Sequence, residues 1–224
     1  MPSGVLCRKW KLIYFGQWSK RKRAIPMKKT VKIILITVIA VFLLIGGVIL
    51  FFVSNWTERT VVKDIAQYEA YFGPDGIHRT EHADIKKKTG ESYLVINDIF
   101  PEKLPESAIT EDFYYEYYNS WDPCYLSYLV YTCDDGDYEA ETARLKSKKY
   151  PEHDLIYGAT GFNYPALAVS ASDFGYIYAM ADEEGKRLIY VELTYCNGFT
   201  DIDYEKIIPE RYLPVGFDAK NKGD

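Results

Sequence analysis

Histidine and cysteine, the residues most often used for metal binding and nucleophilic catalysis, are scarce here: the 224 residues include three histidines and four cysteines. No C-x-x-C pair occurs, so a metal site built from the cysteines is not predicted. The strings G-x-S-x-G and G-x-G-x-x-G and the P-loop pattern are also missing, which removes the best-known signatures of hydrolases, dinucleotide enzymes and NTPases. The sequence therefore predicts no cofactor.

Acidic residues are missing from the first 53 positions, which contain ten lysines and arginines. Within this part, residues 33–53 (IILITVIAVFLLIGGVILFFV) form a run of 21 residues without a charge. As a helix this run is about 31 Å long, enough to cross the hydrocarbon core of a bilayer. The run is longer than the apolar part of a cleaved signal peptide, and no small-x-small site follows it. We therefore predict a single-pass transmembrane helix that acts as a signal-anchor.

The charge distribution predicts the orientation of this helix in the cell membrane. By the positive-inside rule, the basic residues 1–32 are cytoplasmic and the chain after residue 53 is extracellular. Residues 54–224 hold the remaining 17 basic residues and all 32 acidic ones, which gives a net charge of −15. An acidic exterior part argues against binding to nucleic acid, which requires a basic contact surface.

The start of the protein is expected at Met27 rather than Met1. Met27-Lys28-Lys29-Thr30 forms a short basic flank directly before the apolar run. Upstream, Lys20-Arg21-Lys22-Arg23 can be encoded by purine-rich codons at the place where a bacterial ribosome-binding site would fall. The alternative is that residues 1–26 form a genuine basic arm whose aromatic residues lie at the inner membrane surface.

Residues 54–90 are predicted to form an amphipathic helix and a polar stalk. Val61, Ile65, Tyr68 and Phe72 recur at helical spacing, which predicts a helix over residues 57–72. The breaker Gly73-Pro74-Asp75-Gly76 ends that helix, and the segment after it is polar and charged.

Residues 91–217 are predicted to form an exterior α+β domain, followed by a loose tail at 218–224. Aromatic and β-branched residues predict strands at 93–96, 108–118, 124–133, 166–170, 174–180 and 187–196, and a short extended segment at 155–157. A helix starts with the acidic residues Asp134, Asp135 and Asp137 and ends before Pro151. The order β-β-β-α-β-β-β describes an antiparallel sheet with one covering helix.

One short motif points to an enzyme. His78-Arg79-Thr80-Glu81-His82 spells H-x-x-E-H, a pattern of certain zinc peptidases, in which His78 and His82 would bind the metal and Glu81 would be the base. His153 is the remaining imidazole that could complete the site. The flanks lack the apolar stripe of a buried helix, so we interpret the motif as part of a solvated stalk.

A tyrosine-rich strand suggests a binding surface. Residues 113–121 read FYYEYYNSW, with tyrosines on both faces of the predicted strand. Tyr115, Tyr117 and Trp121 are therefore the predicted contacts for a protein partner or a sugar ring. The alternative is that tyrosine is present because it favours a half-buried strand.

The cysteines after the apolar run leave a disulfide open. Cys124 and Cys133 are nine residues apart in one predicted strand, so they point to opposite faces and cannot bond each other. Cys196 could pair with Cys124 if their strands are antiparallel neighbours, or with Cys133 if they are parallel. Three free thiols are the other interpretation.

The segment from Asn97 to Leu145 and the hairpin ADEEGKRLIYVEL together resemble a family of uncharacterised membrane-anchored proteins of Firmicutes. The shared features are an FPE…P segment, a tyrosine-rich strand, the pattern DP.Y, an acidic helix start and a late hairpin that ends in IYV. The resemblance covers about residues 57–217 and implies a bacterial membrane protein without a known activity.

Three functions follow from these observations. We favour a non-enzymatic exterior module on a single-pass anchor that binds an envelope protein or another envelope component. The alternatives are a zinc-dependent envelope hydrolase that uses His78, Glu81 and His82, and a carbohydrate-binding module that uses the tyrosines.

Overall fold

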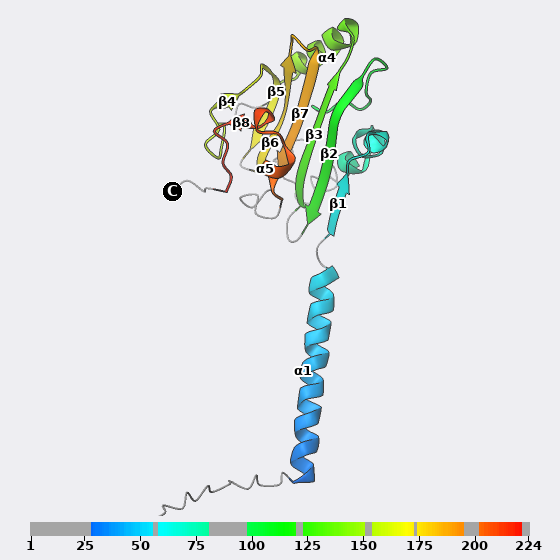
Figure 1. Ribbon diagram of the computed structural model, residues 1–224, viewed down its shortest axis with the longest axis vertical. Coiled ribbons are helices and arrows are strands. Elements are labelled where there is room, and N and C mark those ends of the chain that lie inside the picture. Colours follow the sequence, from blue (N-terminus) through cyan, green and yellow to red (C-terminus); the bar gives the residue numbers. More distant parts are fainter. Residues whose placement is uncertain are drawn as a thin grey trace, which may run out of the picture. The chain divides into compact units, whose positions relative to one another are not determined.

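The computed structural model describes residues 28–55, 58–80, 98–119, 123–150, 154–172, 174–194 and 202–220 (Figure 1). The chain divides into two units, Met1–Phe51 and Phe52–Asp224. We call the described residues 58–220 the sheet domain.

The first unit contains the apolar helix that the sequence predicts. Helix α1 spans Lys29–Asn55, and its stretch Lys29–Val53 is long and apolar enough to cross a membrane. No part of its most apolar window is buried against the protein. A helix of this kind near the N-terminus is typical of a membrane anchor or of a signal sequence.

The second unit is built on one six-stranded antiparallel sheet, which confirms the α+β class. The strand order is β1-β2-β3-β7-β6-β5. The strands are β1 Glu58–Val62, β2 Ile109–Asn119, β3 Pro123–Thr132, β5 Ala166–Ser172, β6 Gly175–Asp182 and β7 Arg187–Thr194. A second, two-stranded sheet pairs β4 (Gly161–Phe162) with β8 (Pro214–Val215). The strand predicted at 93–96 lies outside the described residues.

The helix predicted over residues 57–72 is wrong in its first half. Residues 58–62 form β1, which pairs with β2 so that Val62 lies opposite Tyr115. Thr60, Val61 and Val62 are β-branched and favour a strand, and the ladder to β2 outweighs their helical spacing. The Asp64 side chain then accepts a hydrogen bond from the Ala66 N–H and starts a 3₁₀ turn, Ile65–Gln67, which leads into the short helix α2, Tyr68–Phe72.

Helix α4, Asp135–Ser147, has the capping chemistry that the sequence predicts. The Asp134 side chain accepts a hydrogen bond from the Asp137 N–H at 2.9 Å. Acidic residues lie in the first turn of α4, and Arg144 and Lys146 lie in its last turn. Both arrangements complement the helix dipole.

Both faces of the sheet are covered, whereas the sequence predicted one covering helix. On one face, Tyr138 and Leu145 of α4 and Tyr68 and Phe72 of α2 pack against the strands. On the other face, the C-terminal segment packs against the strands with α5 (Tyr204–Ile207) and a 3₁₀ turn, Glu210–Tyr212. Within the predicted loose tail, Ala219 is buried and the Asp218 N–H donates to Tyr157 O, so residues 218–220 belong to the domain.

Tyrosine hydroxyls bind backbone carbonyl groups inside this core. Tyr178 is fully buried on β6, and its hydroxyl donates to Tyr212 O at 2.6 Å. This hydrogen bond ties the C-terminal segment to the sheet. The ring of Tyr164 also lies near that of Tyr212, with the ring centroids 6.2 Å apart.

We predict that Tyr178→Phe lowers the free energy of unfolding by about 1–2 kcal/mol, because Tyr212 O loses its buried donor. Urea unfolding of the full chain in detergent, followed by circular dichroism, measures the change. Tyr164→Phe is the matched control, since no hydrogen bond joins its hydroxyl to another described residue, and it should change stability by less than about 0.5 kcal/mol. Equal losses for the two variants would contradict the assignment.

Candidate functional site

His78 of the H-x-x-E-H motif lies in the core of the sheet domain, not in a solvated stalk. Its side chain is fully buried, and residues 77–80 form a helical turn after α2. His78 Nε2 lies 2.8 Å from Glu192 Oε2, and Glu192 of β7 is also fully buried. The rings of Phe72 and Tyr125 lie within 5.0 Å of the imidazole, measured between ring centroids. The stalk interpretation is therefore wrong for this residue.

Glu192 accepts hydrogen bonds from two further side chains of the sheet. The Ser127 hydroxyl donates to Glu192 Oε2 at 3.2 Å, and the Thr194 hydroxyl donates to Glu192 Oε1 at 3.4 Å. Ser127 and His78 both contact the carboxylate, so the histidine does not stand between the hydroxyl and the acid as it does in a nucleophilic triad. This arrangement is a buried hydrogen-bonded network that holds the turn at 77–80 against the sheet.

The zinc site itself stays a prediction. Glu81, His82 and His153 lie outside the described residues, and no cluster of three metal-binding side chains occurs among the residues that are described. The Nε2 atom of His78 is engaged by Glu192. Zinc content of the purified chain, with and without His78→Ala, tests this alternative.

We predict that His78→Ala lowers the free energy of unfolding by about 3 kcal/mol, because the Glu192 carboxylate would stay buried without this partner. Chemical unfolding of the full chain in detergent measures the loss. Ile77→Ala, at a neighbouring residue that is 46% exposed, is the control and should cost less than about 1 kcal/mol. A His78→Ala variant as stable as the Ile77→Ala variant would remove the structural role.

The tyrosine surface predicted for partner binding is wrong for the two residues that the structure describes. Tyr115 is 1% exposed and Tyr117 is 9% exposed. Both face the layer that contains α2, where Tyr71 lies against the ring of Tyr115. Trp121 lies outside the described residues. The tyrosines of β2 are core residues, as the alternative interpretation of strand propensity predicts.

The cysteines lie as their spacing predicts. Cys124 is buried in the core that contacts the C-terminal segment, whereas Cys133 packs against the core of the α4 face. Burial and the nearby Asp137 and Asp134 raise the pKa of Cys133 to about 11, so its thiol stays protonated at neutral pH. Cys196 lies outside the described residues, and its disulfide with Cys124 stays a prediction.

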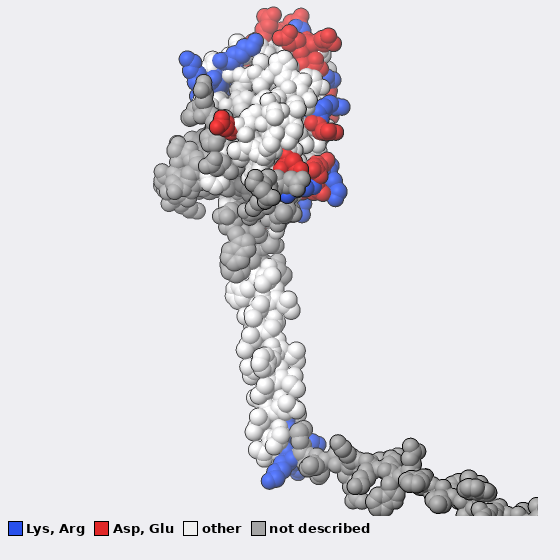
Figure 2. All heavy atoms as spheres, turned by 90° about the vertical axis from the view of Figure 1, so that its left-hand side faces the viewer, with Lys and Arg blue, Asp and Glu red and all other residues white. Residues whose placement is uncertain are grey.

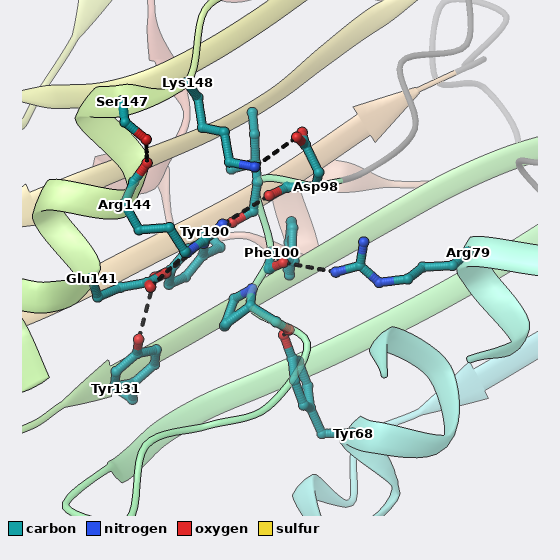
Figure 3. Close-up of polar contacts among 12 residues, drawn as sticks. Tyr68, Arg79, Asp98, Phe100, Tyr131, Glu141, Arg144, Ser147, Lys148 and Tyr190 are labelled. Carbon is teal, nitrogen blue, oxygen red and sulfur yellow. Dashed lines mark hydrogen bonds and ion pairs between the residues drawn. The ribbon is translucent and has the colours of Figure 1, made fainter. Parts of the chain in front are cut away.

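A charged cleft of about 300 Å³ lies between α4, the turn at 77–80 and the loop 98–103. Four cationic side chains line it: Arg79, Lys103, Arg144 and Lys148. Three carboxylates line it as well: Asp98, Glu102 and Glu141. Figure 3 shows how Arg79 reaches the loop from one side, whereas Arg144 of α4 and Lys148, the residue after α4, reach it from the other.

Arg144 holds one wall of this charged cleft. Its guanidinium donates two hydrogen bonds to the Glu141 carboxylate, at 2.7 and 2.5 Å, and one each to the carbonyls of Asp98 and Ile99. The Tyr190 hydroxyl also donates to Glu141, at 2.6 Å. Burial disfavours the charge on Arg144, but Glu141 outweighs that effect and raises the pKa of the guanidinium. Arg144 is therefore a fixed structural cation.

Asp98 is held at the mouth of the charged cleft. Lys148 Nζ donates to its Oδ2 at 2.8 Å, and the Tyr150 hydroxyl donates to its Oδ1 at 2.5 Å. Burial alone would raise the pKa of Asp98, but the hydrogen bonds from Lys148 and Tyr150 outweigh it and lower the pKa. The ionised form of Asp98 therefore stabilises the folded loop.

We predict that Asp98→Asn destabilises the domain at pH 7 but much less at pH 3. A depressed folded pKa contributes stability above the unfolded pKa of about 3.9, and that contribution is lost as the pH falls through the folded value. Because Asp98 is 43% exposed, the difference at pH 7 should stay below about 1 kcal/mol. Unfolding curves at both pH values measure it. Glu106→Gln, at an exposed carboxylate without an ion pair in the described part of the chain, should show no such dependence.

In contrast to the charged cleft, the β5 edge of the sheet domain is formed by a segment without charged residues. Residues 155–172 are 18 consecutive residues without a charge. They include β4 and β5, and β8 adds Val215, which is 40% exposed. We call residues 155–172 and β8 the uncharged face. Figure 2 views the molecule from the side on which Figure 1 places β4, β5 and β8, and shows a broad area without charges that is bordered by charged residues.

Neither the charged cleft nor the uncharged face was identified from the sequence. The cleft joins residues from three separate segments, so no local pattern reveals it. The uncharged run from Leu155 to Ser172 is visible in the sequence and could have been noticed, given that 26% of all residues are charged.

No protein family model, no curated protein and no solved structure matches this chain. The resemblance to membrane-anchored proteins of Firmicutes stays a prediction.

Proposed function

We propose that this protein is a non-enzymatic interaction module, held at the cell membrane by α1, whose sheet domain binds a protein partner outside the cell. The single observation that carries the proposal is the uncharged edge strand β5, which has no neighbouring strand other than β6 among the described residues. The partner would add an extended segment to this edge, as in other cases of strand addition.

The anchoring part of the proposal rests on α1 and its flanks. Helix α1 is long enough to span a bilayer. Lys28, Lys29 and Lys32 lie at its start, and the positive-inside rule favours the cytoplasm for that end. The sheet domain would then face outward.

The binding part rests on the difference between the two edges of the sheet. β5 pairs with β6, and β1 pairs with β2, so each has one edge without a neighbouring strand among the described residues. β1 carries Glu58 and Arg59, both exposed, and such charges protect an edge from unwanted pairing. β5 (ALAVSAS) has no charge and no proline over seven residues. Its edge is therefore the better template for an incoming strand.

Charge also determines what kind of partner fits. The part of the chain after residue 53 has a net charge of −15, so most of its surface favours cations and repels acidic proteins. The uncharged face neither attracts cations nor repels acidic proteins, and the half-buried Val169 and Ala171 on β5 offer small apolar contacts. A neutral extended segment with small or β-branched side chains matches this edge.

A sugar ring is not favoured as the ligand. Sugar binding requires exposed aromatic faces, and Tyr115 and Tyr117 are buried. The described residues of β2 therefore no longer support the carbohydrate-binding alternative.

Site-specific photo-crosslinking of the full chain in its own membranes tests the proposal. A photo-reactive residue at Val169 should give one discrete product with a different protein, because the partner strand would lie beside β5. Adding Ala171→Lys should remove this product, since a lysine on the edge opposes pairing. The matched control is the same photo-reactive residue at Val61 on β1, which is 44% exposed and should give none.

Equal products from positions 169 and 61, or none from position 169, would refute the edge as the contact. A product with twice the mass of the chain would show that a second copy binds there and would refute a different partner.

A further inference from the structure

Main-chain groups along the β5 edge alternate in direction, and this alternation determines where a strand can add. In an antiparallel ladder, residues that exchange hydrogen bonds with one neighbouring strand alternate with residues whose N–H and C=O groups point the other way. The Ala181 N–H of β6 donates to Pro165 O at 3.0 Å, so the main chain of Ala181 faces β5. Every second residue of β6 before it, namely Ala179, Ile177 and Gly175, therefore faces β5 as well.

The register transfers this alternation to β5. Ser170 lies opposite Ile177, so the N–H and C=O groups of Ser170 point toward β6. Val169 and Ala171 lie on either side of Ser170, and their N–H and C=O groups point away from β6. These two residues of β5 thus offer main-chain donors and acceptors to an incoming strand.

The stretch of β5 that can pair with a further strand is short. Between Ala166 and Ala168 the register with β6 shifts by one position, because Leu167 is an extra residue in β5. Before this shift, Pro165 has no N–H to donate. A regular strand can therefore follow β5 only over residues 168–172.

One face of an added strand would continue an apolar surface. Side chains that lie directly opposite each other in paired strands share one face of the sheet. Val169 and Ala171 pack against the core that contains the C-terminal segment, and Tyr178 lies opposite Val169. The ring of the half-buried Phe162 lies 4.8 Å from that of Tyr178, measured between centroids. Because residues 155–172 carry no charge, the partner residues on this face should be apolar.

The other face of the added strand places a weaker demand on the partner. Ser170 points to the face covered by α4, since Ile177 opposite it belongs to the core that includes Tyr138 and Leu145 of α4. Ser170 is small, polar and buried, so it offers the partner no apolar side chain at this position. The partner residue opposite Ser170 is therefore not restricted to an apolar type.

We infer that β5 binds an extended segment of the pattern apolar-x-apolar, antiparallel to β5, whose two apolar residues form main-chain hydrogen bonds with Val169 and Ala171. The antiparallel direction is favoured because such pairs are slightly more stable per residue than parallel ones. This inference rests on the proposed strand addition at β5, and it specifies the register, the direction and the sequence class of the partner segment.

Two proline variants test the alternation in the full chain in detergent. Ala171→Pro removes an outward N–H and should move the urea midpoint of unfolding by less than about 0.5 M, since an edge strand accepts proline where its N–H faces solvent. Ser170→Pro removes an N–H that faces β6 and should lower the midpoint by more than about 1 M. Circular dichroism follows the unfolding. Equal losses for the two variants would overturn the assignment of the outward groups.

Photo-crosslinking from Val169 in native membranes tests the main-chain contact itself. Ala171→Pro should lower the yield of the product with a different protein by at least about tenfold, because a hydrogen bond is lost and the proline ring blocks the edge. Ala171→Ser is the matched control, since it keeps both the N–H and the small size, and it should retain the product. An undiminished product in Ala171→Pro would overturn main-chain pairing but leave β5 as the contact, whereas no product without any substitution at position 171 would refute the proposed function itself.

Mass spectrometry of the crosslinked peptides tests the direction and the pattern. A photo-reactive residue at Ala171 should reach the partner two residues before the position that is reached from Val169, as antiparallel pairing requires. Both partner positions should carry apolar side chains. The reverse order would overturn the antiparallel direction, and a charged residue at either position would overturn the apolar-x-apolar pattern.

Discussion

A buried hydroxyl requires a hydrogen bond, and this requirement organises a core that is built largely from tyrosine. Tyr68, Tyr176 and Tyr178 donate to backbone carbonyls of Pro101, Ile156 and Tyr212 in three separate segments. These segments have little regular structure of their own, so the side chains of α2 and β6 fix their paths. The tyrosines thus act as ties between the strands and the loops as well as filling the core.

The same requirement shapes the wall of the charged cleft, where a pair of tyrosines lies beside the ion pair of Glu141 and Arg144. The hydroxyls of Tyr131 and Tyr190 are 3.2 Å apart, and Tyr190 donates to Glu141. Burial raises the pKa of Tyr190, with further contributions from Tyr131 and Glu141, so this hydroxyl remains a donor at any physiological pH. Glu141 in turn fixes Arg144, which holds the loop at Asp98 and Ile99. The position of this loop therefore depends on a chain of contacts that begins inside the sheet.

The parts of the fold that follow local rules could be predicted, and those that depend on distant contacts could not. The predicted strands at 108–118 and 124–133 and the helix capped by Asp134 match the structure within a few residues. β1 was missed because its apolar residues fit a helical period equally well, and the pairing with β2 decides its structure. Tyr115 was assigned to the surface because nothing local indicates that α2 covers it.

The contacts of His78 could not be predicted either, although here the sequence singled out the residue and only its partner was missed. The motif H-x-x-E-H suggested a role for His78, but the partner that fixes it is Glu192, more than 100 positions away. One signal was present: Glu192 is a charged residue inside the strand RLIYVELT, where a carboxylate facing a covered sheet needs a buried partner. That signal predicts a polar contact without identifying His78.

Helix α4 connects the charged cleft with the β5 edge, since it lines the cleft and also contacts β5. Communication between the regions would require a second stable position for this helix. Leu145 is fully buried, and Arg144 is fixed by bonds to Glu141, Asp98 and Ile99, so a shift of α4 would break several buried contacts at once. Helix α4 is therefore a rigid support for both the charged cleft and the β5 edge.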